Sequence, residues 1–120
     1  MSKYADVYLV PMPEENIPAY KKLATAAGKL FVKHGALRYR EYVASDLDVE
    51  EVVPFPKRIK LKPGETLVYA AVEFNSEAHR NKVMKAIMAD PAMGEIMVGQ
   101  KPPFDYKRMV YGGFKILVDL

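Results

Sequence analysis

Residues 4–35 read YADVYLVPMPEENIPAYKKLATAAGKLFVKHG, and this stretch decides the fold. Over residues 4–10, the side chains at 5, 7 and 9 fall on one face of an extended chain and those at 4, 6, 8 and 10 fall on the other. We therefore expect a half-buried strand, closed by Pro11 and Pro13. A strand that leads directly into a helix is the first half of a β-α-β unit.

An amphipathic helix is predicted after this strand. Apolar side chains recur every three or four positions from Ile17 to Phe31, and His34-Gly35 supplies a natural helix end. Further strands are predicted at 36–44, 66–74 and 109–118, and a second helix from 75 or 76 that ends or kinks at Asp90-Pro91. Residues 45–64 are predicted to form an extended arm or short hairpin, and residues 92–108 a long loop. The order β-α-β-β-α-β predicts a ferredoxin-like fold of the α+β class, with a four-stranded antiparallel sheet and two helices on one face. We expect a single domain over residues 1–120.

The composition narrows the class of protein. The chain has 120 residues, of which 50% are hydrophobic and 28% charged, with a net charge of +3 and no cysteine. These values exclude intrinsic disorder, disulfide bonds, thiolate metal sites and thiol catalysis. The longest apolar run, residues 67–72, is far shorter than the ~20 residues that span a bilayer. Charges interrupt the first residues, so we expect no signal peptide and a cytoplasmic protein.

Two helices on one face leave the other face of the sheet uncovered. The strand phases place Tyr8, Val10, Leu67, Tyr69, Met109 and Tyr111 on that uncovered face. Such a face is too apolar to remain in water. The sequence therefore predicts a homodimer that packs sheet against sheet.

The same face is predicted to line a cavity in the dimer. The candidate ligand-binding residues are Asp6, Tyr8, Arg38, Arg40, Tyr69, Glu73 and Tyr111, with Tyr42 and Lys115 beside them. Tyrosines suit small organic ligands, arginine binds a carboxylate or phosphate with two hydrogen bonds, and a desolvated Asp6 or Glu73 would act as a base. The alternative is a polar dimer interface in which these carboxylates and arginines pair across the twofold axis. Met93, Met97 and Phe104 are candidates for a lid over the cavity.

Charged side chains are segregated in the arm. The acidic residues are Asp46, Asp48, Glu50 and Glu51, and the basic residues are Lys57, Arg58, Lys60 and Lys62. A net charge of +3 is a weak signal for nucleic acid, and no aromatic side chain lies between the lysines to stack on bases. We expect a solvated edge; the alternative is a contact with an anionic partner or RNA through the Lys57–Lys62 arm.

The two histidines do not indicate a metal site. His34 lies at the end of the first helix, where a partial positive charge is favourable. His79 lies in the first turn of the second helix, and no second histidine follows three or four positions later. We expect no metal and no cofactor.

Several short motifs resemble one known family. They are Val10-Pro11-Met12-Pro13, His34-Gly35-Ala36-Leu37, Phe55-Pro56, Met88-Ala89-Asp90-Pro91, Pro103-Phe104-Asp105 and Lys107-Arg108-Met109-Val110-Tyr111-Gly112-Gly113-Phe114. Together they resemble an uncharacterised bacterial family, domain of unknown function 1428, of the dimeric α+β barrel superfamily, over essentially the whole chain. Members often have a cysteine after the glutamate of the second strand, where this chain has Glu41-Tyr42. Thiol chemistry therefore does not apply here.

The resemblance implies the fold and a homodimer, but no established activity, so no catalytic residue carries over. The wider superfamily includes cofactor-independent monooxygenases, isomerases and haem-handling proteins. The first hypothesis is therefore a homodimer that binds a small organic ligand in a sheet-lined cavity, as an oxygenase or isomerase. The second is a non-catalytic interaction module that uses residues 57–62 against an anionic partner. A structural or regulatory dimer is the third.

Overall fold

A computed structural model describes residues 3–98 and 101–120. Its strands are β1 (Tyr4–Pro13), β2 (Arg38–Val43), β3 (Glu65–Phe74) and β4 (Val110–Lys115). Its α-helices are α1 (Ile17–Lys33), α2 (Phe55–Arg58), α3 (Glu77–Met88) and α4 (Pro91–Met97), and 3-10 turns cover Glu14–Asn16 and Tyr106–Arg108. Within these described ranges, no helix has the length and apolar character needed to span a membrane.

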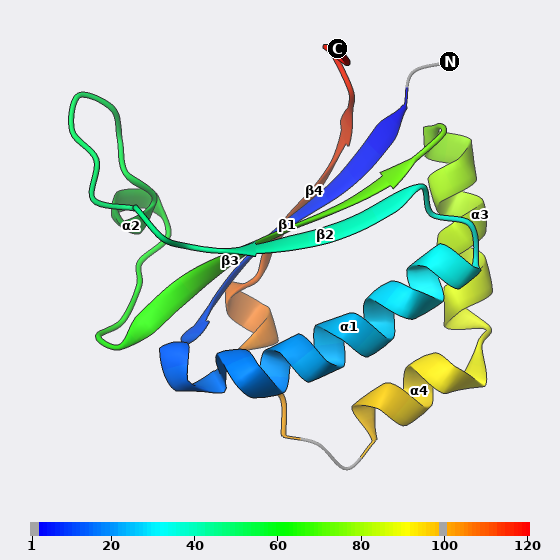
Figure 1. Cartoon of the computed structure of the whole chain (residues 1–120), viewed down its shortest axis with the longest axis horizontal. Coiled ribbons are helices and arrows are strands. Elements are labelled where there is room, and N and C mark those ends of the chain that lie inside the picture. Colours follow the sequence, from blue (N-terminus) through cyan, green and yellow to red (C-terminus); the bar gives the residue numbers. More distant parts are fainter. Residues whose placement is uncertain (1–2, 99–100) are drawn as a thin grey trace.

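The four strands form one antiparallel sheet in the order β2-β3-β1-β4. Helices α1, α3 and α4 lie on one side of it, and the β2–β3 connection extends beyond the sheet as an arm that includes α2 (Figure 1). The central position of β1 and β3 follows from the β-α-β-β-α-β order. The predicted ferredoxin-like α+β fold is confirmed.

The first strand passes through Pro11 and ends at Pro13, so Pro13 closes it as predicted and Pro11 does not. β3 pairs with β1 from Tyr4 to Pro13, whereas β4 pairs with it only from Tyr4 to Leu9. Beyond Leu9, β1 is therefore an edge strand on its β4 side. At such an edge the missing N–H of proline removes no ladder hydrogen bond.

Helix α1 ends as predicted. The backbone amide of His34 donates to the carbonyl of Leu30 (3.0 Å), and the amide of Ala36 donates to the carbonyl of Phe31 (2.9 Å). Gly35 has φ +111°, in the left-handed region that favours glycine. This turn leads the chain into β2 and leaves α1 lying across the covered face (Figure 1).

The segment 92–108 is not one long loop. Asp90 begins α4 by accepting a hydrogen bond from the amide of Ala92 (2.9 Å), and it also contacts Nε2 of His34 at 2.7 Å. A proline in the first turn is compatible with helix, so Asp90-Pro91 separates two helices instead of ending helical structure. The prediction of a loop failed because the capping role of Asp90 was not recognised.

The proposed lid is part of the packed structure. Met93 packs against the buried cluster formed by the sheet, α1 and α3. Phe104 packs against a second buried cluster, with its ring 5.7 Å from that of Tyr20. The side chain of Met97 lies outside the described part of the structure. Met93 and Phe104 are therefore partly buried against the core on the helix-covered side of the sheet.

The helices cover one set of alternate side chains in β1. The buried clusters on this covered face include Tyr4, Val10 and Met12 of β1 and Val68, Val72 and Phe74 of β3. Four residues that were predicted on the uncovered face lie on the covered side instead, namely Tyr8, Val10, Met109 and Tyr111. Both faces of β1 are apolar, so alternation separates the faces without saying which one the helices cover. Leu67 and Tyr69 do lie on the open face, beside Pro11 and Leu9 of β1.

Candidate functional site

The predicted ligand-binding residues lie on opposite faces of the sheet. Three of them face the helices, namely Asp6, Tyr8 and Tyr111. The other four face the open side, namely Arg38, Arg40, Tyr69 and Glu73. Tyr42 is opposite Tyr69, and Lys115 is opposite Tyr4. The expected single cluster is therefore not formed by these described residues, because the phase assigned to β1 and β4 was reversed relative to β2 and β3.

The open-side group follows strands β2 and β3. Arg38 is directly opposite Glu73, and the rings of Tyr42 and Tyr69 are 5.5 Å apart. Arg38 and Arg40 are exposed in the protomer. Ligand binding by this group stays a prediction, and its position on the open face fits the interface alternative equally well.

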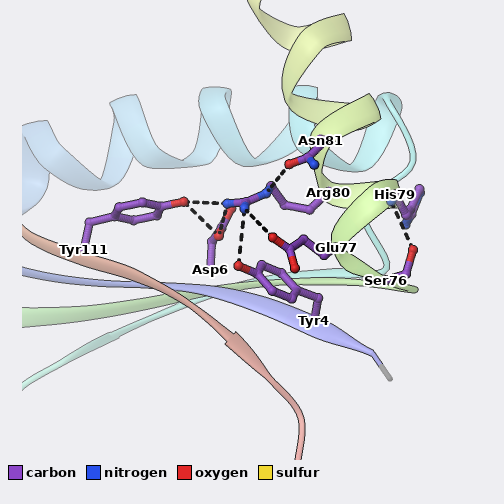
Figure 2. A network of polar contacts seen from close by, with 8 residues as sticks. All are labelled: Tyr4, Asp6, Ser76, Glu77, His79, Arg80, Asn81 and Tyr111. Atoms are coloured by element: carbon purple, nitrogen blue, oxygen red, sulfur yellow. Dashed lines mark hydrogen bonds and ion pairs between the residues drawn. The ribbon is translucent and has the colours of Figure 1, made fainter. Parts of the chain in front are cut away.

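The first covered-side cluster is centred on Asp6 (Figure 2). Asp6 is fully buried, and its Oδ1 accepts hydrogen bonds from Nη1 of Arg80 (2.8 Å) and from the hydroxyl of Tyr111 (2.9 Å). Arg80 reaches these groups from α3, and its Nη1 also donates to the Tyr111 hydroxyl (2.7 Å). The cluster therefore ties α3 to β1 and β4.

Tyr4 packs closely against this cluster. Nη2 of Arg80 donates to the Tyr4 hydroxyl (3.2 Å), and its guanidinium lies 4.8 Å from the centre of the Tyr4 ring. The Tyr4 hydroxyl lies against Gly113, where an added Cβ would come within 2.0 Å of it. Burial raises the pKa of Asp6 above its ordinary value of 3.8, although Tyr111 and Arg80 act to lower it. These features indicate a structural anchor.

A row of side chains leads from this cluster to a second one. Tyr8 is opposite Tyr111 in β4 and opposite Ala70 in β3, and Ala70 is in turn opposite Glu41 in β2. The rings of Tyr8 and Tyr111 are 4.8 Å apart. Burial and the nearby Asp6 raise the pKa of the Tyr8 hydroxyl, so it stays protonated. The row crosses all four strands on the covered face.

The second covered-side cluster is centred on Glu41, which is half-buried. Its two carboxylate oxygens accept hydrogen bonds from the hydroxyls of Tyr20 in α1 and Tyr39 in β2. Burial, together with the charge of Glu41 and its hydrogen bonds, raises the pKa of both hydroxyls. Both therefore remain protonated and continue to donate. Glu41 was not predicted as a site residue, although an acid on the apolar face of the second strand was a signal in the sequence.

A groove of about 780 Å³ lies beside this cluster, between α1 and β2. Its apolar lining includes Ile17, Ala24, Val32, Val43 and Val68. Its polar groups are the Glu41 cluster and the exposed Lys21, Thr25 and Lys29 of α1. Among the described residues, no group of three or more histidine, cysteine, aspartate or glutamate side chains is placed to hold a metal ion.

Gly28 sets the approach of α1 to β2 along this groove. A Cβ at Gly28 would lie 2.6 Å from Cδ1 of Tyr39, so the helix rests directly on that ring. The ring of Phe31 lies 5.5 Å from the same ring on the core side. Tyr39 is therefore held in place, and its hydroxyl is fixed at Glu41.

Comparison with known proteins identifies a family. A family model described as a protein of unknown function (DUF1428) matches residues 3–106, which confirms the resemblance seen in the motifs. The uncharacterized protein YbaA of Escherichia coli K12 is 38% identical over 117 residues, which cover 98% of both chains. YbaA of Shigella flexneri matches with the same identity and coverage.

Solved structures share the fold at low sequence identity. A nipsnap family protein with unknown function from Agrobacterium tumefaciens gives a TM-score of 0.60 at 16% identity, over 96% of this chain and 88% of that chain. A protein from an uncultured marine organism, described as a dimeric ferredoxin-like protein, gives 0.57 at 12% identity over 100% of both chains. Likeness at these identities shows the fold alone.

Proposed function

The chain belongs to the DUF1428 family of proteins of unknown function, and from this premise we propose that it is a cytoplasmic homodimer that binds a small organic molecule in the groove between α1 and β2. The ligand is largely apolar and carries a hydrogen-bond donor. One observation carries the proposal: a carboxylate, Glu41, is held by two tyrosine hydroxyls at the wall of a largely apolar groove.

The chemistry of Glu41 defines the polar group of the ligand. Each carboxylate oxygen has two acceptor positions, and each accepts one hydrogen bond from a tyrosine. A hydroxyl or N–H of a ligand would take a remaining position. Because Tyr20 and Tyr39 stay protonated, they hold Glu41 in one orientation for that donor.

The size and rim of the groove define the rest of the ligand. A volume of about 780 Å³ falls within the ~300–1,000 Å³ of typical small-molecule sites. Lys21 and Lys29 flank the groove on the solvent side and would favour a negatively charged substituent at the outer end. Hydroxylated aromatic compounds and their carboxylic acids combine these features.

The open face of the sheet supports the homodimer. Its side chains include Leu9 and the exposed Tyr69 and Val110, which lie in register across β3, β1 and β4, and the exposed Phe114, which is opposite Ala5 of β1. A protomer that left this face in water would expose a contiguous apolar surface. Structural neighbours described as dimeric add support.

An enzymatic role would build on the same groove. An isomerase or a cofactor-independent oxygenase that acts on a hydroxylated aromatic ligand would use Glu41 to accept the proton of the bound hydroxyl. Binding precedes either reaction, so the experiment on binding applies to both.

Calorimetric titration with matched pairs of ligands tests the proposal. Each pair consists of a phenol or hydroxybenzoate and the analogue that lacks the hydroxyl. The wild-type protein is expected to bind the hydroxyl compound about tenfold or more tightly, because the analogue leaves the Glu41 acceptor unpaired. In Glu41→Gln this preference is expected to fall to a few-fold.

Tyr69→Phe is the matched control, because it removes a tyrosine hydroxyl on the open face and leaves the groove unchanged. It is expected to keep the full preference. Equal binding of both members of every pair by wild type, or an undiminished preference in Glu41→Gln, would show that Glu41 does not receive the ligand.

A further inference from the structure

The arm, residues 45–64, carries a mirrored pattern of charge that neither the sheet nor the groove uses. Counted outward from Pro54, the mirrored charged pairs are Glu51 with Lys57, Glu50 with Arg58, Asp48 with Lys60 and Asp46 with Lys62. The mirrored apolar pairs are Val53 with Phe55, Val49 with Ile59 and Leu47 with Leu61. Every acid thus has a base at the same distance on the other side of Pro54, and apolar residues mirror apolar residues.

These charges are not paired within the protomer. All eight charged side chains are exposed, and none takes part in the ion pairs found among residues 3–98 and 101–120. The arm does not fold into a hairpin about Pro54. Instead it turns at Glu51, which has φ 70°, and then forms the single turn of α2. The acidic and basic segments of the arm therefore form no ion pair with each other in the described protomer, although the charge of Lys62 contributes to lowering the pKa of the neighbouring Glu65.

The middle of the arm is apolar and exposed. Val52, Val53 and Phe55 are 69%, 56% and 48% exposed, respectively. At its base, Leu47 and Phe55 form an apolar hollow of about 200 Å³ with Leu9, Leu67 and Tyr69 of the sheet. The arm is thus continuous with the open face assigned above to the homodimer.

We propose that the arms of two copies of this chain pair antiparallel across a twofold axis. Segment 46–51 of each copy then contacts segment 57–62 of the other, and the apolar residues around Pro54 are buried at the centre. A twofold interface is self-complementary, since each contact between two segments is made twice, and a mirrored sequence is what such an interface needs. An apolar centre with a charged rim is also the usual arrangement of an interface.

A second copy fits this surface better than an RNA does. The four negative charges of segment 46–51 would repel phosphates that approach the basic segment. An unrelated protein partner would give no reason for the mirror about Pro54. The residues of α2 span a shorter distance than extended residues do, so the two halves of the arm differ in length. The acidic segment of one copy therefore faces the basic segment of the other as a whole, without pairing of each individual residue. The pairing rests on the proposed homodimer and is independent of ligand binding.

Charge-reversal variants measured by sedimentation equilibrium test this pairing. One variant carries Asp46→Lys, Asp48→Lys, Glu50→Lys and Glu51→Lys, and the other carries Lys57→Glu, Arg58→Glu, Lys60→Glu and Lys62→Glu. Each alone is expected to raise the dimer Kd at least about tenfold, because like charges then face each other. An equimolar mixture of the two, and a chain with all eight changes, are expected to return to within about threefold of wild type.

The controls separate this proposal from the homodimer itself. Lys22→Glu, Lys82→Glu and Lys85→Glu reverse exposed charges on the helices and are expected to leave the dimer Kd unchanged. If the arm variants dimerise like wild type and Phe114→Asp on the open face weakens the dimer, the arm pairing is wrong. The proposal of a homodimer through the open face would then still hold. A wild-type protein that is monomeric at micromolar concentration would overturn both. The variant with glutamate at positions 57, 58, 60 and 62 also tests RNA binding. If it loses binding to single-stranded RNA while its dimer Kd is unchanged, the arm binds RNA and does not pair with a second arm.

Discussion

Two carboxylates lie on the same covered face of the sheet, and their surroundings give them different roles. Asp6 and Glu41 each accept hydrogen bonds from tyrosine hydroxyls. Asp6 is also paired with Arg80 and is sealed from solvent, whereas Glu41 has no cationic partner among the described residues and lies beside an open groove. The first arrangement holds elements together, and the second leaves an acceptor available.

The difference comes from the neighbouring elements. At the Asp6 cluster, the Tyr4 hydroxyl fills the space above Gly113 and α3 lies over the strands. At Glu41, α1 rests on Tyr39 at Gly28 but leaves a groove along β2, the edge strand. Of the two carboxylates, only Glu41 is a candidate binding group, because the groove between α1 and β2 lies beside it.

Arg80→Leu is expected to have the largest effect on stability. It leaves Asp6 buried without a cation, so we expect the free energy of unfolding to fall by about 3–5 kcal/mol in urea titrations. The double variant Asp6→Asn with Arg80→Leu removes the unpaired charge and is expected to recover part of this loss. A loss no larger than that of Arg38→Leu, at an exposed position on the open face, would show that the Asp6 cluster is not an anchor.

Gly113→Ala is expected to cost about 1–3 kcal/mol of unfolding free energy, because its Cβ would overlap the Tyr4 hydroxyl in a closed cluster. Gly28→Ala places a Cβ against the ring of Tyr39. The clash costs stability, but alanine inside α1 also has a higher helix propensity than glycine, so we expect a smaller net loss together with weaker ligand binding. Gly94→Ala is the control, because no atom of the residues that the structure describes lies within 4 Å of its Cβ position. Equal losses at all three glycines would contradict the distinction between closed and open clusters.

The pH dependence of stability is expected to differ between Asp6 and Asp90, which is paired with His34. The folded-state pKa of Asp6 is raised above 3.8, so the folded state binds its proton more tightly than the unfolded chain does. The contribution of Asp6 to the unfolding free energy therefore falls as pH rises from about 3.8 through its folded-state pKa. Asp90 behaves in the opposite way. The hydrogen bond with His34, and that from Ala92, lower its pKa to about 2, so its contribution is lost as pH falls from 3.8 to about 2.

Urea midpoints between about pH 2 and pH 7 in Asp6→Asn and Asp90→Asn measure these two contributions. Asp6→Asn is expected to remove the decrease above pH 3.8, and Asp90→Asn to reduce the decrease at more acidic pH. A wild-type curve unchanged by Asp6→Asn would mean that burial does not set the protonation of this carboxyl.

Tyr20→Phe is expected to have the smallest effect, about 0.5–1.5 kcal/mol of unfolding free energy, because it removes one hydrogen bond beside a groove that water reaches. The freed oxygen of Glu41 remains an acceptor, so phenol binding is expected to persist. Tyr111→Phe removes the hydroxyl that bridges Asp6 and Arg80, and it should cost more. The same loss for both variants would remove the contrast between the clusters.

The topology followed from local signals, whereas the site did not. Alternation in β1, the helical spacing of α1 and the left-handed Gly35 were sufficient to predict the first strand and the first helix, whereas the short helices α2 and α4 were not predicted. The face that each strand turns toward the helices depends on packing between distant segments, so Asp6 and Tyr111 were assigned to the wrong side. Arg80 belongs to a short helix with many charges, and only the docking of α3 over β1 reveals its partner. Glu41 was visible as an acid among apolar residues, but its bond to Tyr20 required the position of α1.

Crystal structures of the wild-type protein soaked with small hydroxylated aromatic fragments show whether the groove between α1 and β2 binds such a ligand. We expect electron density for a fragment in this groove, with its hydroxyl within hydrogen-bond distance of Glu41. Fragments bound only on the open sheet face or the arm would contradict this expectation, as would a groove filled by the partner protomer.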